Sequence, residues 1–144
     1  MRLQDLMKRS VETISPAESA DAASERMRQR RIHHLVVMDG RRVVGVVSQR
    51  DIATKASREG RTVDGVMSSP AVTAEPQMTV RHAANLLRGR TLGCLPILER
   101  EKLVGIVTIT DLLELIGRGA ERPAPRPGRR VLERRGLRRQ PLRG

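Results

Sequence analysis

The sequence predicts a mixed α/β (α+β) fold of two βαββα repeats, packed with pseudo-two-fold symmetry and followed by a disordered basic tail. The first observation is internal similarity: shifting the chain by 60 residues aligns 3–53 with 63–113 without a gap, and eleven positions are identical. The second is that short, continuous apolar runs alternate with amphipathic stretches in each copy. We therefore divide the chain into repeat 1 (1–60), repeat 2 (61–116) and a tail (117–144).

Each repeat begins with an extended lead segment, residues 11–14 in the first copy and 71–74 in the second, which ends in a proline turn. A helix with an apolar stripe follows the turn. Ser19 and Thr79 precede these helices, and their hydroxyls suit them to be the N-caps.

A hairpin and a final helix complete each repeat. The predicted strands are 35–38 and 43–47 in repeat 1, and 95–98 and 103–107 in repeat 2. The first hairpin turns at Asp39-Gly40, a favoured dipeptide for a two-residue turn. The final helices are expected over 48–57 and 108–116. One repeat alone would bury a marginal core, so the pair is the smallest stable unit and a symmetric dimer of such pairs is expected.

Composition excludes several classes of function. The 144 residues include no Phe, Tyr or Trp, so the chain cannot stack single-stranded bases on aromatic rings. Its single cysteine, Cys94, cannot form an internal disulfide or, with three scattered histidines, a zinc site. Apolar runs such as 43–47 are too short to cross a bilayer, and the first ten residues lack the apolar region of a secretory signal. We expect a cytoplasmic protein without a metal or membrane partner.

One motif occurs in both repeats at the same place: Gly45-Val46-Val47-Ser48-Gln49-Arg50-Asp51 and Gly105-Ile106-Val107-Thr108-Ile109-Thr110-Asp111. The glycine allows close approach of another backbone, and the helix that follows begins with free N–H groups that attract an anion. The carboxylate three residues after the hydroxyl can accept hydrogen bonds from two neighbouring hydroxyls of a ligand. The same spacing is also an ordinary capping box that needs no ligand, and both roles can coexist.

The repeat length, the element order and the paired motifs resemble a tandem pair of CBS (cystathionine-β-synthase) domains, also called a Bateman module, over roughly 3–116. The Leu95-Pro96-Ile97 strand is similar to the family as well, whereas Leu35-Val36-Val37 lacks the proline. The resemblance implies a stand-alone regulatory module that is not an enzyme. It would bind AMP, ADP, ATP or S-adenosylmethionine between the repeats and signal to a partner by a conformational change.

The resemblance also implies roles for individual residues. Asp51 and Asp111 would accept hydrogen bonds from ribose hydroxyls, and Ser48 and Thr108 would face phosphate. By analogy, the residues along the adenine edge would come from the lead segments: Val11, Thr13, Ser68, Val72 and Thr73.

Repeat 1 is expected to suit phosphate better than repeat 2. It carries His33, His34 and Arg50 where repeat 2 has Gly93, Cys94 and Thr110. The alternative for the histidines is one exposed and one half-buried strand residue without a ligand. For Cys94, a small core residue is the favoured interpretation over a redox-sensitive thiol.

The tail holds most of the positive charge. The whole chain has 28 Lys and Arg against 16 Asp and Glu, a net +12, and residues 117–144 contribute ten Arg and two Glu, or +8. A segment with four Pro, five Gly and few apolar residues is expected to be disordered. It is either a solvated extension or an electrostatic arm for an acidic protein, a nucleic acid or the module's own bound nucleotide. The second option gives an alternative function: a nucleic-acid-associated protein with the CBS pair as its dimeric scaffold.

Overall fold

The computed structural model describes residues 1–55 and 61–120. The chain divides into two compact units, Met1–Leu113 and Glu114–Gly144. Both repeats lie in the first unit, apart from the end of the last helix. That helix, α5 (Ile109–Ala120), runs past the predicted end at 116, so the first four residues of the expected tail are helical. The rest of the expected tail, 121–144, lies outside the described residues.

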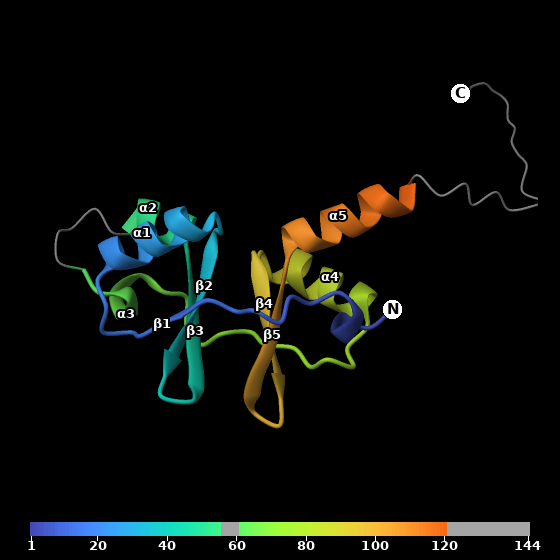
Figure 1. Ribbon diagram of the computed structural model, residues 1–144, viewed down its shortest axis with the longest axis horizontal. Helices are drawn as coiled ribbons and strands as arrows, with labels where there is room; N and C mark the ends of the chain where they lie inside the picture. The colour runs from blue at the N-terminus through green and yellow to red at the C-terminus, as the bar shows by residue number, and fades with distance from the viewer. Residues whose placement is uncertain (56–60, 121–144) are drawn as a thin grey trace, which may run out of the picture. The chain divides into compact units, whose positions relative to one another are not determined.

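Repeat 1 folds in the predicted order (Figure 1). Its elements are β1 (Thr13–Ile14), α1 (Ala20–Arg30), β2 (His34–Asp39), β3 (Arg42–Ser48) and α2 (Gln49–Lys55). The sheet order is β1-β2-β3, with β1 parallel to β2 and β2 antiparallel to β3.

Repeat 2 follows the same plan with one reduced element. Its elements are α4 (Val80–Arg90), β4 (Cys94–Glu99), β5 (Lys102–Thr108) and α5, with β4 antiparallel to β5. The predicted lead strand at 71–74 is reduced to one parallel bridge between Ala74 and Ile97. Two short helices, η1 (Leu3–Asp5) and α3 (Val63–Val66), precede the lead segments and were not predicted.

The helix starts are confirmed, whereas the first hairpin turn is shifted by one residue: Asp39 ends β2 and pairs with Arg42, so the two turn residues are Gly40 and Arg41. The Ser19 hydroxyl accepts from the Ala22 amide at 2.9 Å, and the Thr79 hydroxyl accepts from the His82 amide at 3.1 Å. The turn at Gly40 has a φ of +65°, which glycine adopts without strain. These features depend on neighbours in the sequence, which is why the pattern of residues predicts them well.

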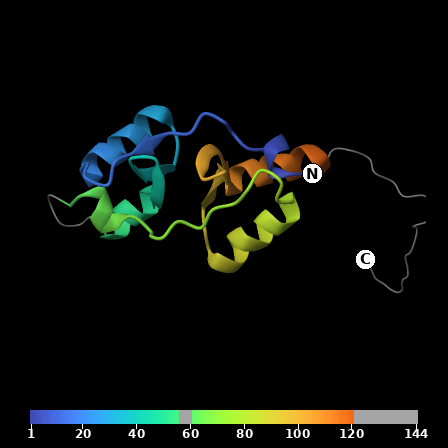
Figure 2. The same ribbon diagram turned by 90° about the horizontal axis from the view of Figure 1, so that it is seen from below.

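The opening segment of each repeat, residues 3–8 and 63–68, packs on the other repeat, and we call these two stretches the crossing segments. Leu3 and Met7 lie in the core of repeat 2, whereas Val63 and Val66 lie in the core of repeat 1. Backbone bonds fix both crossings: the Leu3 amide donates to Met78 at 2.9 Å, and the Val63 amide donates to Glu18 at 2.8 Å. Figures 1 and 2 show η1 beside α4 and α3 beside α1 and α2. Each repeat is therefore completed by the crossing segment of the other repeat.

A third apolar cluster joins the two hairpins. Val36 of β2, Cys94 of β4 and Ile106 of β5 are its buried members. This packing holds the ends of the two sheets together, and the candidate site lies next to it. Among the described residues, no helix is long and apolar enough to cross a membrane.

Candidate ligand-binding cleft

The duplicated motif forms a capping box in both repeats. The Ser48 amide donates to Asp51 Oδ2 at 3.0 Å, and the Asp51 amide donates to Ser48 Oγ at 3.0 Å. Thr108 and Asp111 make the same two bonds at 2.9 and 3.1 Å. In each box one carboxylate oxygen is used by the backbone. The capping function therefore leaves the other oxygen, Oδ1, for a second partner.

The motif glycines allow the crossing segments to approach. The Ser68 amide donates to the Val46 carbonyl at 2.8 Å, and the Val46 amide donates back at 3.1 Å. A methyl group on Gly45 would lie 2.7 Å from the Ser68 carbonyl oxygen, closer than non-bonded atoms can approach. The close approach that the glycine was predicted to permit is thus made by the chain's own backbone, and it sets Ser68 beside the motif of repeat 1.

A cavity of about 740 Å³ lies beside Ser68 and the motif of repeat 1. Seven of the predicted site residues line it: His33, His34, Ser48, Arg50, Asp51, Ser68 and Val72. Its wall also includes α4 residues and strand β4, so both repeats contribute to it. The volume falls within the range of small-molecule sites.

The charged groups of this cavity are mainly basic. Arg50 and Arg88 are guanidinium groups that stay protonated, His33 and His34 add imidazoles, and Asp51 is the one carboxylate among the residues that line it. Such a lining favours a ligand that is anionic at one end and offers hydroxyl donors to Asp51 at the other.

His34 is held against the opposite repeat. A methyl group on Gly93 would lie 2.2 Å from His34 Nε2, so the ring rests on the glycine backbone. Burial lowers the pKa of His34 below 6.5, and the neighbouring His33 lowers it further, while Asp51 acts in the opposite direction. His33 is exposed and His34 is half-buried, as expected if the two histidines were ordinary strand residues without a ligand. Both residues also line the cavity.

Cys94 lies in the cavity wall and is buried, with 4% of its surface exposed. Burial raises the pKa of its thiol to about 12, and the nearby Asp51 carboxylate raises it as well. The thiol is therefore protonated at neutral pH, in keeping with the predicted core role.

The other predicted site residues lie elsewhere. Val11 packs beside the cluster that joins the hairpins, and Thr13 is in β1, where its carbonyl accepts from Arg26 at 2.8 Å. Thr108 and Asp111 form the second capping box, where the buried Asp111 pairs with Lys8.

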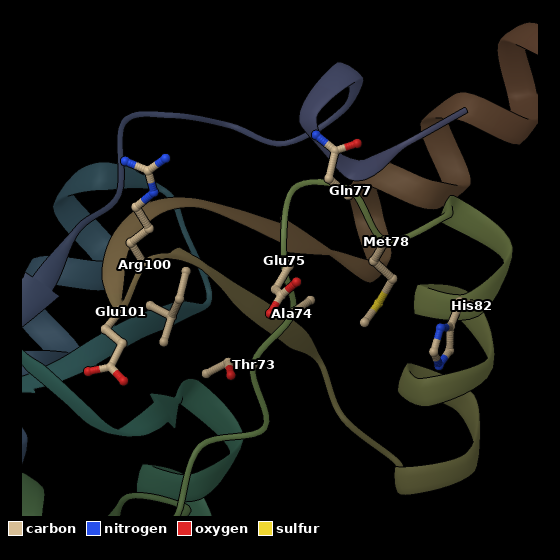
Figure 3. A pocket seen from close by; sticks show the side chains of 9 residues that line it. Thr73, Ala74, Glu75, Gln77, Met78, His82, Arg100 and Glu101 are labelled. Carbon is tan, nitrogen blue, oxygen red and sulfur yellow. The ribbon is translucent and has the colours of Figure 1, made fainter.

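Thr73 lines a different pocket, of about 610 Å³, on repeat 2. Figure 3 shows Arg100 and Glu101 of the β4–β5 turn on one side of the lead segment and His82 of α4 on the other. The lead segment of repeat 2 therefore contributes to two pockets, Val72 to the larger and Thr73 to the smaller.

Sequence reasoning missed the part of the larger cavity that comes from the end of α4. Leu87, Arg88, Thr91 and Leu92 line it there. Thr91 has a positive φ of 54° as the cap of the helix, which ends α4 beside the cavity. The 60-residue repeat shows which residues are equivalent, but not which helix end lies beside which motif. Nothing in the sequence therefore indicated that these four residues line the cavity.

The model of the CBS domain matches the chain twice, over residues 3–58 and 63–118, and the chain therefore belongs to the CBS domain family as a tandem pair. A curated relative, CBS domain-containing protein YhcV of Bacillus subtilis, is 32% identical over 76% of this chain and 81% of its own length. Longer relatives also match. The chain spans 60% of an uncharacterized protein of Methanopyrus kandleri and between 14% and 24% of several relatives named as enzymes.

Solved structures have the same fold. The CBS domain pair of protein MJ0100, in complex with 5′-methylthioadenosine and S-adenosyl-L-methionine, superposes with a TM-score of 0.78 at 24% identity and covers 83% of this chain and 98% of that one. CBSX2 in complex with AMP gives a TM-score of 0.73 at 23% identity, covering 83% of this chain and 98% of that one. The predicted fold of two CBS repeats is confirmed.

Proposed function

We propose that this chain is a regulatory binding module, not an enzyme, that takes up an adenosine compound in the cavity beside Asp51. The candidates are AMP, ADP, ATP and S-adenosylmethionine. The observation that carries the proposal is the grouping of Ser48, Asp51, His33, His34 and Arg50 around one cavity of about 740 Å³. The structural neighbours named above were solved with ligands of this class, which supports the same choice here.

The ribose would be held by Asp51. Its Oδ2 accepts from the Ser48 amide, whereas Oδ1 lies 3.7 Å from Lys55 Nζ, beyond hydrogen-bond distance. Within the described part of the chain, no donor hydrogen-bonds Oδ1. This oxygen has two lone pairs and can accept from ribose hydroxyls without breaking the capping box.

The anionic end of the ligand would face Arg50, His33 and His34, and Arg88 lies at the same cavity. A phosphate or a carboxylate would form charge-assisted hydrogen bonds with the guanidinium groups. The apolar part of the wall, including Val72, Leu87 and Leu92, would cover the base. Binding would change the relative stability of conformations or dimer contacts, and a partner protein would respond to that change.

Dye-based thermal shift with AMP, ADP, ATP and S-adenosylmethionine tests this function. At a ligand concentration of 100 times Kd, binding stabilises the folded state by about 2.7 kcal/mol, which raises Tm by several degrees. The shift should disappear in Asp51→Ala. Asp111→Ala is the matched control, because it removes the same capping box from the other repeat. Equal shifts in Asp51→Ala and in the native protein, or none in the native protein with any of the four compounds, would contradict the proposal.

A second function is suggested by the charge of the tail, +8 over residues 117–144. In this alternative the tail holds a nucleic acid or an acidic protein and the CBS pair serves as the dimeric scaffold. A variant ending at Ala120 keeps helix α5 complete. Loss of salt-dependent DNA or RNA binding in that variant, with nucleotide binding retained, would support the alternative. Full-length protein that binds neither nucleic acid would exclude it.

A further inference from the structure

The two motif carboxylates differ in what lies at their second oxygen. Positions 8 and 68 are equivalent in the 60-residue register, and each crossing segment pairs with the motif strand of the other repeat. Ser68 thereby comes to the cavity of Asp51, and Lys8 comes to Asp111. One motif meets a short neutral side chain, and the other meets an ammonium group.

Lys8 Nζ donates to Asp111 Oδ1, and the Thr108 amide donates to Oδ2 at 2.9 Å. Both carboxylate oxygens of Asp111 therefore have partners within the chain. Asp111 is 3% exposed, and a buried carboxylate is costly unless it is paired and hydrogen-bonded. Lys8 supplies the charge partner that this buried group needs. Asp51 is more open, with 18% of its side chain exposed, and within the described part of the chain the ammonium group beside its Oδ1 is that of the more distant Lys55.

A second equivalent position differs as well. Arg50, which lines the cavity of Asp51, is replaced by Thr110 in the second motif, so the Asp111 motif has no guanidinium group at this place.

We propose that Lys8 acts as a built-in substitute for the ribose hydroxyls at Asp111, so that each chain binds one adenosine nucleotide, at Asp51, and not two. A nucleotide entering beside Asp111 would have to displace the ammonium group from a buried carboxylate. At Asp51 the nearby ammonium group is that of Lys55, whose Nζ lies 3.7 Å from Oδ1, beyond hydrogen-bond distance, so among the described residues a nucleotide would displace no hydrogen-bonded partner of this oxygen. This inference rests on the proposed function and specifies which of the two motifs binds the nucleotide.

The chain offers its own reciprocal test. Lys8→Ser replaces the lysine beside Asp111 with the serine found at the equivalent position 68. Ser68→Lys places a competing ammonium group beside Asp51. Isothermal titration with AMP, and with ATP if AMP does not bind, should give one site per chain in the native protein and two in Lys8→Ser. In Ser68→Lys the affinity should fall at least about tenfold, and in the double variant the single site should move to Asp111.

Controls separate this inference from loss of folding and from failure of the proposed function. Lys8→Met removes the charge but keeps an extended side chain, and it too should gain affinity at Asp111; thermal unfolding monitors the fold of each variant. Two sites in the native protein, or one site in folded Lys8→Ser and Lys8→Met, would overturn the inference while leaving nucleotide binding established. If the native protein binds none of AMP, ADP, ATP and S-adenosylmethionine, the proposed function is overturned instead, and the inference with it.

Discussion

Gly45 lies directly against the carbonyl oxygen of Ser68, where a methyl group would stand 2.7 Å from that oxygen. The two residues belong to different repeats, and the contact occurs where the crossing segment pairs with β3. The equivalent Gly105 is equally close to the other crossing segment: a methyl group there would lie 3.0 Å from the Lys8 carbonyl oxygen and 2.6 Å from Met7 Sδ. The motif glycine therefore has a structural role in joining the repeats.

We predict that Gly45→Ala lowers the free energy of unfolding by about 1–3 kcal/mol, the usual cost of overpacking. The obstacle is a backbone oxygen, which cannot rotate away as a side chain can, so the crossing segment must shift. Gly105→Ala should cost less, because the nearest atom there belongs to the flexible Met7 side chain and the Lys8 carbonyl oxygen would be 3.0 Å away. Urea unfolding followed by circular dichroism measures the effect, because the chain has no Trp or Tyr for fluorescence.

Gly89→Ala is the matched control for these variants. Gly89 lies in α4, is exposed, and has open space where a methyl group would be. Alanine should stabilise this helix position by about 0.5–1 kcal/mol. Stability of Gly45→Ala equal to that of the native protein would show that the crossing segment is not fixed against β3.

The sequence predicts the local parts of this fold well. The N-caps Ser19 and Thr79 and the hairpins follow from residues near one another in the chain, and the structure has them at the predicted places. The same holds for the capping boxes of Asp51 and Asp111, since hydroxyl and carboxylate are three residues apart.

The exchange of the crossing segments between the two repeats could not be predicted in this way. A 60-residue shift shows that Lys8 and Ser68 are equivalent, but it does not say on which copy each segment packs. The contacts of Lys8 with Asp111 and of Ser68 with Val46 depend on that choice. Thr73, expected beside the ligand, lines the smaller pocket on repeat 2, while its neighbour Val72 lines the larger cavity.

We predict that His34 makes the protein less stable in mild acid. Its pKa is lowered in the folded state from the ordinary value of 6.5, so the folded state binds fewer protons than the unfolded state near that pH. The free energy of unfolding should therefore fall as pH decreases from about 6.5. His34→Gln should reduce the difference in Tm between pH 7.5 and pH 5.

His82→Gln controls for the loss of an imidazole, because His82 is an exposed residue on α4. It should retain the acid dependence of the native protein. If His34→Gln and the native protein lose the same number of degrees between the two pH values, His34 does not cause the effect.

We predict that the thiol of Cys94 reacts slowly in the folded protein. A pKa of about 12, compared with an ordinary value of 9.0, lowers the thiolate fraction at pH 8 about a thousandfold, and burial restricts access as well. Ellman's reagent should label one thiol per chain in denaturant and react at least about a hundredfold more slowly without it. Rapid labelling of the folded chain would contradict the buried position.

The last prediction concerns the first turns of α5, where Ile109 and Leu113 are 43% and 61% exposed while Asp111 and Leu112 are buried. The two exposed side chains are four residues apart and so lie on one face of the helix. We expect these two side chains to contribute to a contact with a second copy of the chain, in line with the predicted homodimer. Leu113→Glu should therefore convert a dimer into a monomer in size-exclusion chromatography with light scattering. Gln29→Glu adds a negative charge to an exposed position on α1 and should leave the dimer intact. A native protein that is monomeric, or a Leu113→Glu variant that remains dimeric, would exclude this face as the dimer contact.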